Sequence, residues 1–340
     1  MSKRNKNYFF VVTGLQVINC VEYIHSNNVI KDFNVLIVCN KENTARLEVN
    51  STLKLYDWDK VIYLPPSFIL NLKNSSLKFL INLFYSWIRL NVINFKGSSI
   101  IGNDITIFFR YITKNKKIKN IVFIDDGNGT INYNSKNPYE EFKSRSNKFI
   151  YKFLAIHKHV FFPNIFFTAY PESIKPLSNQ KIITNNFAYI NNLKKNTVTI
   201  EKVYFIGDPH VERGYMSKEE YIEALIVLNN LFDNNLIYVP RIYEGNDKLN
   251  EIRNHMQVLK NDTPFENFIV TSEFLPTALV AFHSTVLFNL KKMCGDSLKY
   301  YFIKLPHYTN EFHMNNLKTI WSSLEEFAIE LHPFGEDHIK

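Results

Sequence analysis

Short apolar segments alternating with helical segments are the feature that most constrains how this chain can fold. In the first 170 residues the strand-like segments are 8–13, 34–39, 60–64, 98–101 and 121–124. Helices are expected at 15–26, 75–90, 105–112 and 140–155. Short apolar strands that alternate with helices are typical of a parallel sheet covered on both faces. The sequence therefore predicts an α/β fold.

The same pattern begins again near residue 200. Residues 170–199 are polar, contain two prolines and many Asn and Lys, and are predicted to include a linker. Strand-like segments follow at 202–206, 236–239, 279–282 and 300–303, with helices at 217–232, which begins with a capping box, and at 317–331. We therefore expect two Rossmann-like domains facing a cleft, residues 1–170 and 200–340, joined by a linker at 171–199. This arrangement resembles that of many nucleotide-sugar glycosyltransferases, in which the nucleotide lies on the C-terminal domain and the acceptor lies across the cleft.

Composition and charge narrow the class of protein. The chain is 46% hydrophobic and 21% charged, which is typical of a globular protein. Its net charge of +8 suits an anionic partner. The basic residues are scattered and form no nucleic-acid-binding motif, so we expect no nucleic-acid partner. The three cysteines lack metal-ligand spacing and are predicted to be reduced, mostly buried thiols of a cytosolic protein. The polar start of the chain predicts no signal peptide.

One segment, 79–95, comes closest to a membrane span, but Asn82, Arg89, Asn91 and Asn94 interrupt it. We expect a buried helix packed against a sheet. The alternative is a helix that lies on the membrane surface with Trp87 and Arg89 at the interface.

The segment 123–130 is the first candidate site. The strand-like run 121–124 ends in Asp125 and Asp126, and glycines follow at 127 and 129. A parallel strand that ends this way delivers carboxylates to the rim of a sheet, where ligands bind. Two crowded carboxylates repel each other, so that one of them can act as a base. The alternative is an ordinary turn, since Asp-Gly and Asn-Gly are common turn formers.

Three strand ends of the second half carry polar residues that could meet in one site. The first is Gly207–Gly214, in which Asp208, His210, Glu212 and Arg213 offer acid and base groups. The alternative for this segment is a solvated loop shaped by proline and glycine.

The second strand end is Tyr238–Glu244, where Arg241 follows Pro240 in a suitable place to hold a phosphate or carboxylate. The alternative is an ordinary surface arginine. In the third strand end, His283-Ser284-Thr285 precedes a helix, whose free amides favour a phosphate. The alternative for the two hydroxyl groups is helix capping alone. His283 is either a packed or a catalytic histidine. The histidines show no metal-binding spacing, so no metal or cofactor is expected.

Taken in order, these segments resemble the bacterial lipooligosaccharide sialyltransferases, family 52 of the glycosyltransferases. The matching pieces cover most of the chain in order: 8–16 (YFFVVTGLQ), 123–130, 205–221 (FIGDPHVERGYMSKEEY), 238–244 and 282–290. The resemblance implies a single inverting displacement, without a metal, that moves sialic acid from CMP-sialic acid to a hydroxyl of an acceptor sugar.

The resemblance also implies roles for residues. It places Asp125 and Asp126 on the acceptor side and Ser284 and Thr285 at the donor phosphate. The donor site would further include Gly207, Pro240, Arg241, Glu244 and His283. The base of the family, a carboxylate just after the Gly-x-Pro turn, corresponds to His210.

One segment departs from the family pattern. Where the family has Pro-His-Pro-Arg-Glu, this chain has Arg241, Ile242 and Tyr243 between Pro240 and Glu244. Arginine can stabilise a leaving phosphate by charge but cannot deliver a proton at neutral pH. Proton transfer to the leaving group would then fall to His210 or His283, and the base could be Asp208, His210 or the Asp125–Asp126 pair.

We therefore expect a sialyltransferase that acts on a bacterial surface glycan, a lipooligosaccharide or capsule, or a transferase for a related nonulosonic acid. Its partners would be a CMP-sugar donor and a lipid-linked glycan acceptor at the inner face of the cytoplasmic membrane, and the resemblance allows a homodimer. The alternatives are a transferase of the same fold with another nucleotide-sugar, or a non-catalytic member that binds glycans or nucleotides.

Overall fold

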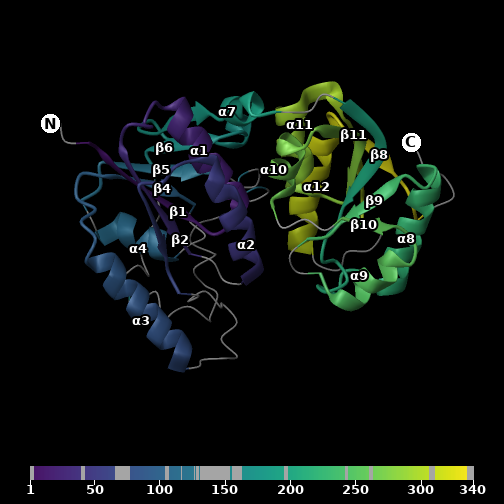
Figure 1. The fold of residues 1–340 in the computed structure, drawn as a ribbon, viewed down its shortest axis with the longest axis horizontal. Coiled ribbons are helices and arrows are strands. Elements are labelled where there is room, and N and C mark those ends of the chain that lie inside the picture. Colours follow the sequence, from purple (N-terminus) through teal and green to yellow (C-terminus); the bar gives the residue numbers. More distant parts are fainter. Residues whose placement is uncertain are drawn as a thin grey trace. The chain divides into compact units, whose positions relative to one another are not determined.

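The computed structural model describes residues 4–39, 43–65, 77–103, 107–115, 117–125, 127, 130, 154, 163–194, 198–241, 244–259, 263–305 and 311–334. The chain divides into two compact units, Met1–Tyr189 and Ile190–Lys340. Figure 1 shows the elements of each unit.

The first unit is built on a parallel sheet. Among its described residues seven strands pair in the order β3-β2-β1-β4-β5-β6-β7, and every pair is parallel. The strands are β1 (Lys6–Val11), β2 (Phe33–Val38), β3 (Lys60–Tyr63), β4 (Ser99–Gly102), β5 (Asn120–Ile124), β6 (Ile165–Thr168) and β7 (Lys181–Thr184). The order shows that the chain first builds outward from β1 to β3 and then returns to add β4 on the other side of β1.

Helices cover both faces of this sheet. They are α1 (Gly14–Ser26), α2 (Asn43–Thr52), α3 (Leu77–Asn91) and α4 (Ile107–Asn115), with the short helices η1 (Leu53–Leu55) and η5 (Pro171–Ser173). Alternate residues of β1 enter opposite cores: Phe10 packs with α3 and α4 side chains, and Phe9 packs with α1 and α2 side chains. Because both faces of the strand are buried there, β1 is a continuous apolar run from Tyr8 to Val11 rather than an alternating one.

The second unit repeats the design with a parallel sheet of six strands in its described residues, in the order β10-β9-β8-β11-β12-β13. The strands are β8 (Val198–Ile206), β9 (Leu236–Val239), β10 (Gln257–Val258), β11 (Phe274–Ala281), β12 (Lys299–Ile303) and β13 (Ile329–Leu331). The helices are α7 (Ala188–Asn192), which spans the boundary between the units, α8 (Lys218–Leu231), α9 (Asn246–Arg253), α10 (Phe265–Thr271), α11 (Thr285–Cys294), η6 (Gly295–Ser297) and α12 (Glu311–Glu325).

The predicted linker differs from the observed structure. Residues 171–199 contain β7 and α7, and β7 pairs with β6 as the outer strand of the first sheet. The polar composition that indicated a linker reflects an edge strand, whose residues are at most half-buried. The chain passes from one unit to the other near residue 190, within α7.

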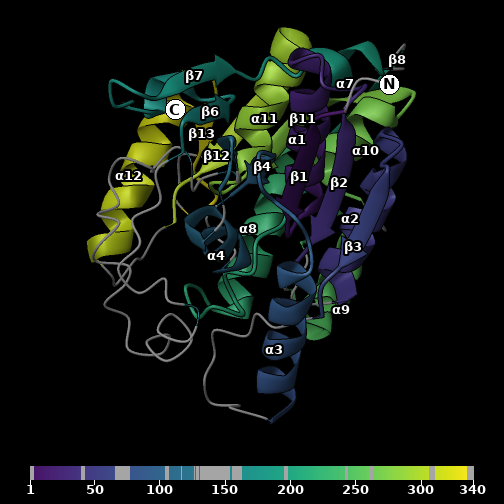
Figure 2. The ribbon, with the colours of Figure 1, turned by 90° about the vertical axis from the view of Figure 1, so that its left-hand side faces the viewer.

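Other predictions agree or differ locally. All three cysteines are free and buried, as predicted. The expected closing helix 317–331 is instead the end of α12 followed by β13. The expected helix 140–155 falls almost wholly outside the described residues. The helix predicted in 79–95 is α3, but only one of its faces is buried; Figure 2 shows it extending beyond the ends of the neighbouring strands. None of the helices in the described ranges has the length and apolarity needed to cross a bilayer.

Candidate functional site

In the sheet of the second unit, the order in which the chain adds strands reverses between the neighbouring strands β8 and β11. From β8 the chain adds β9 and β10 on one side, and from β11 it adds β12 and β13 on the other. In open parallel sheets the crevice at the carboxyl ends of the strands at such a reversal is where ligands bind. The segments that follow these two strands begin with Gly207 and Phe282. The predicted segments 207–214 and 282–285 therefore meet at the switch point.

Asp208 and two histidines lie together at this switch point. His210 Nδ1 is 3.4 Å from Asp208 Oδ1, and the rings of His210 and His283 are stacked with centroids 5.0 Å apart. His210 is fully buried, whereas the side chain of Asp208 is 18% exposed. Arg213 Nη1, on a half-exposed side chain, lies 3.8 Å from Asp208 Oδ1. Asp208 and His283 are both partly exposed, so solvent and ligands can reach them, whereas His210 lies fully buried behind the Asp208 carboxylate.

Burial decides the protonation of both histidines. It lowers the pKa of His210 to about 3, against an opposing effect of the Asp208 carboxylate. Burial likewise lowers the pKa of His283. His210 is therefore a neutral imidazole at physiological pH and a poor proton acceptor.

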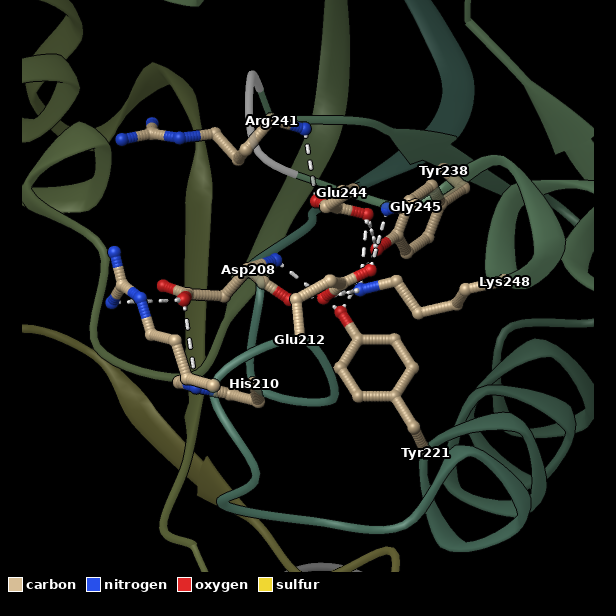
Figure 3. A network of polar contacts seen from close by, with 10 residues as sticks. Asp208, His210, Glu212, Tyr221, Tyr238, Arg241, Glu244, Gly245 and Lys248 are labelled. Carbon is tan, nitrogen blue, oxygen red and sulfur yellow. Dashed lines mark hydrogen bonds and ion pairs between the residues drawn. The ribbon is translucent and has the colours of Figure 1, made fainter. Parts of the chain in front are cut away.

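A second group of polar side chains surrounds the buried ammonium of Lys248 on α9 (Figure 3). Lys248 Nζ lies 3.1 Å from Glu212 Oε2 and 3.3 Å from Glu244 Oε2, and it donates to the carbonyl oxygen of Asp208 at 3.0 Å. The same ammonium lies 4.4 Å from the ring centroid of Tyr221, a cation–π contact. Lys248 is only 2% exposed, so these partners take the place of water around its ammonium group.

Two tyrosines extend this network through the core. Asp208 N donates to Tyr221 Oη at 3.3 Å, the hydroxyls of Tyr221 and Tyr238 are 2.9 Å apart, and Tyr238 donates to Glu244 Oε2 at 2.5 Å. Burial raises the pKa of Glu244, while Lys248 and Tyr238 oppose that rise. The network ties the segment after β8 to the segment after β9, and it fixes the backbone that carries Asp208.

Gly207 is required by this arrangement. A Cβ at residue 207 would come closer than 3.0 Å to Glu244 Oε1 and Tyr238 Oη. The network closes over the backbone here, and only glycine leaves the space. Gly207 therefore serves the packing of the site.

The structure separates the predicted donor contacts into two groups. Glu244 is turned inward: its side chain is fully buried, and Oε1 accepts from Arg241 N at 2.9 Å. Arg241 is exposed, and Figure 3 shows its guanidinium pointing away from the Lys248 network. Pro240, between β9 and Arg241, is half-buried. Arg241 is thus available to a ligand, whereas the Glu244 carboxylate already has a full set of protein partners.

Ser284 is the N-cap of α11. Its Oγ accepts from Val286 N at 3.3 Å, and the residue is 7% exposed. Thr285 is the first residue of the helix and is half-buried. Capping explains the serine, and a phosphate contact of either hydroxyl stays a prediction.

In the first unit Asp125 has a structural partner. Its Oδ2 accepts from Ala169 N at 2.6 Å, and its carbonyl oxygen accepts from Asn19 Nδ2 at 3.2 Å. The residue is 3% exposed. Asp125 thus joins the end of β5 to the end of β6. Asp126 lies outside the described residues, so its predicted role as a base stays a prediction.

Asp208, His210 and His283 are also the one group in the described part of the chain whose ligand atoms, all within 4.8 Å of one another, could hold a metal ion. A carboxylate with two neutral imidazoles is a donor set that Zn²⁺ accepts. The sequence analysis expected these strand ends to meet in one site, but it missed the metal-binding geometry, because the histidines lack metal-ligand spacing along the chain.

Sequence reasoning also missed Lys248, Tyr221 and Tyr238. A signal was present, since Lys248 follows Glu244 by four residues, the spacing of an ion pair on a helix. That spacing is common on solvated helices, so it did not indicate a buried lysine.

Comparison with known proteins shows the fold. No family model matches the sequence, and no curated protein matches it. Several solved structures match over most of their length. TcCGT1 in complex with UDP has a TM-score of 0.54 and 11% identity, over 96% of this chain and 86% of that one. Phytolacca americana UGT2, complexed with UDP-2fluoro-glucose and pterostilbene, has a TM-score of 0.52 and 9% identity, over 100% of this chain and 88% of that one.

A UDP-glucosyltransferase from Polygonum tinctorium capable of glucosylating indoxyl matches with a TM-score of 0.50 and 10% identity, over 100% of this chain and 87% of that one. At these identities the likeness defines the fold alone. Together with the two parallel-sheet α/β units it shows that the chain has a GT-B-like fold, as predicted.

Proposed function

We propose that this chain is a glycosyltransferase that takes its sugar from a nucleotide-sugar donor bound on the second unit. The observation that carries the proposal is the meeting of Asp208, the two histidines and the N-terminus of α11 at the switch point between β8 and β11. The GT-B-like fold supports it, and so do the matched structures, two of which contain UDP or a UDP-sugar.

The donor that we propose is CMP-sialic acid or a related CMP-nonulosonic acid. The support is the resemblance of five ordered segments to the lipooligosaccharide sialyltransferases. Exposed Arg241 and Arg213 offer guanidinium groups suited to the phosphate and carboxylate of such a donor. The acceptor would be a hydroxyl of a lipid-linked bacterial surface glycan at the cytoplasmic membrane face.

We assign the base to Asp208. Its side chain is reachable, whereas His210 is fully buried and neutral. In the proposed displacement the acceptor hydroxyl gives its proton to the Asp208 carboxylate, and its oxygen forms the bond to the anomeric carbon. The bond from that carbon to the phosphate oxygen breaks, and CMP leaves with the electron pair. His210 positions Asp208 from behind, and an arginine stabilises the charge on the leaving phosphate.

The second candidate is a transferase of the same fold with another nucleotide-sugar. It is favoured by Arg241, which stands where the sialyltransferases have a histidine, and by the UDP ligands of the matched structures. A non-catalytic relative that binds nucleotides is the third.

A thermal-shift titration with CMP, CMP-sialic acid, UDP and GDP, each with and without EDTA, separates these candidates. A ligand that binds only the native state raises its melting temperature. We expect CMP and CMP-sialic acid to stabilise the protein with or without EDTA. Stabilisation by UDP or GDP alone would reassign the donor. A CMP shift that EDTA abolishes would point to a cation held by Asp208, His210 and His283.

Activity of variants then tests the base. Asp208→Asn should lower turnover at least about a hundredfold while leaving the CMP-induced shift intact. Asp233→Asn is the matched control, since Asp233 is exposed in a turn at φ 53°, a conformation that asparagine also adopts. Full turnover by Asp208→Asn would show that another group is the base.

A further inference from the structure

Helix α3 of the first unit has two apolar faces. Its inner face packs into the core: Leu83, Ser86 and Leu90 are 3%, 0% and 0% exposed. Six large apolar side chains of the helix and its first following residue are 42 to 79% exposed: Leu80, Ile81, Phe84, Tyr85, Ile88 and Val92. We call these six the outer face of α3. A helix on a soluble unit normally places charged or polar residues there.

The outer face is continuous from Leu80 to Ile88, and in the last turn of the helix the exposed Asn91 is a polar residue within the same arc. At about 100° per residue, its six side chains fall within roughly 140° of the helix circumference. Arg89, whose Nη1 donates to the carbonyl oxygen of Tyr63 at 2.9 Å, lies outside this arc. Scattered apolar residues on a surface are ordinary, but a continuous apolar strip along one helix marks an interaction site.

The sequence around the outer face is strongly basic. Between residues 77 and 119 the sequence contains eight lysine or arginine residues and a single acidic one, Asp104. Lys96, Lys117 and Lys119 are exposed, and none of them pairs with a carboxylate in the part of the chain that the structure describes. Positive charge beside an apolar strip matches the charge of an anionic lipid surface.

A depression lies at the end of the strip. It has a volume of about 360 Å³ and is lined by residues 91–96 together with Lys117. Gly97 N donates to the carbonyl oxygen of Lys117 at 2.8 Å, which holds the segments carrying Lys96 and Lys117 side by side. Val92, 79% exposed, belongs both to the strip and to the lining of the depression. Apolar side chains and two ammonium groups are therefore joined in one surface.

We propose that this surface docks the protein onto a bilayer of anionic phospholipid, with the outer face of α3 among the acyl chains and Lys96 and Lys117 at the phosphates. An amphipathic helix with basic flanks binds in this way when it lies in the plane of the interface. Figures 1 and 2 both show α3 extending past the ends of the neighbouring strands, so the helix can approach a flat surface. Docking of this kind needs no spanning segment, and it places the first unit beside lipid-linked molecules.

Vesicle co-sedimentation with the full chain tests the proposal. The probes are vesicles of phosphatidylglycerol with phosphatidylcholine, and vesicles of phosphatidylcholine alone, at low and high salt. We expect the protein to bind the anionic vesicles at low salt and to bind them more weakly at high salt. Binding to the neutral vesicles should be weaker than binding to the anionic ones. Phe84→Gln with Ile88→Gln should weaken binding at least about tenfold. Lys96→Gln with Lys117→Gln should weaken it about fivefold for each lysine removed.

Two controls keep this test specific. Leu47→Gln removes an apolar side chain that is 52% exposed on α2 of the same unit, and Lys299→Gln removes an exposed lysine of the second unit. Both should bind vesicles like the unaltered protein. All variants change exposed positions, so their melting temperatures should agree within a few degrees.

Failure of the unaltered protein to bind anionic vesicles would overturn the proposal, and so would equal binding by the Phe84→Gln/Ile88→Gln variant. If that variant instead changes the size of the particle in solution without vesicles, the outer face is a protein interface. Vesicle binding is independent of nucleotide binding and turnover, so failure here would leave the proposed transferase standing.

Discussion

Replacing Lys248 by methionine should destabilise the second unit in a way that depends on pH. Methionine keeps most of the side-chain volume but leaves the fully buried Glu244 carboxylate without its cation. Breaking a buried ion pair by removing one partner costs about 3–5 kcal/mol. The cost has a ceiling, because Glu244 can take up a proton instead of staying charged.

That ceiling sets the expected magnitude. A glutamate carboxyl group has an ordinary pKa of 4.5. Keeping it protonated costs about 3.4 kcal/mol at pH 7 and about 0.8 kcal/mol at pH 5. In the variant the folded-state pKa of Glu244 rises further above its unfolded value. The resulting penalty is small near or below the unfolded pKa and grows as the pH increases. We therefore expect Lys248→Met to lose about 3 kcal/mol at pH 7 and about 2 kcal/mol less than that at pH 5.

The assay is urea denaturation followed by circular dichroism at both pH values, with hydrogen exchange of peptides from residues 198–259 to identify the transition of the second unit. Lys218→Met is the matched control. Lys218 is 39% exposed and lies 4.0 Å from Glu251, so its loss should cost about 0.5 kcal/mol or less.

Adding Glu244→Gln to Lys248→Met should recover part of the loss at pH 7, because no buried charge then remains. A loss below about 1 kcal/mol for Lys248→Met at pH 7, or an equal loss at both pH values, would refute the reasoning.

Three further predictions concern single residues. Gly207→Ala should cost about 2–4 kcal/mol of folding free energy in a urea melt, whereas Gly245→Ala, where the nearest atom to the new Cβ would be 3.5 Å away, should cost less than about 1 kcal/mol. The pKa of His210 is lowered to about 3 in the folded protein, so as the pH falls this histidine takes up a proton in the unfolded state first. His210 alone should therefore remove about 1.4 kcal/mol of folding stability between pH 7.5 and 5.5. NMR of the folded protein should show no protonation of its imidazole in that range. Asp125→Ala should cost about 2 kcal/mol through the orphaned amide of Ala169, and a calorimetric transition of the first unit that does not move would contradict the structural role assigned to this carboxylate.

Local sequence patterns were sufficient for most of the fold. The apolar run 236–239 is β9, and the capping box at Ser217 starts α8 as predicted. Both features depend on neighbouring residues, so they are visible in the sequence. The edge strands β7, β10 and β13 were missed because an edge strand needs little apolar surface and its pairing partner is distant in the chain.

The candidate site shows the same division. The sequence places Asp208, Arg241 and Ser284 each just after a strand-like apolar run. Because parallel strands end at one edge of their sheet, these residues could be expected at the same edge. The sequence alone also determined the α/β class, the repetition of the pattern in two halves and the strongly basic stretch around α3, all of which are properties of composition and spacing.

Only the tertiary structure decided which of these side chains face a ligand and which face the core. It buried Glu244 and His210, left Asp208 and Arg241 reachable, and placed Lys248 under the backbone of the site. It also left one face of α3 exposed, although the sequence indicated a buried helix. The physical reason is that burial and pKa depend on every element packed around a side chain, and that surrounding set is fixed by the fold of distant segments rather than by neighbours along the chain.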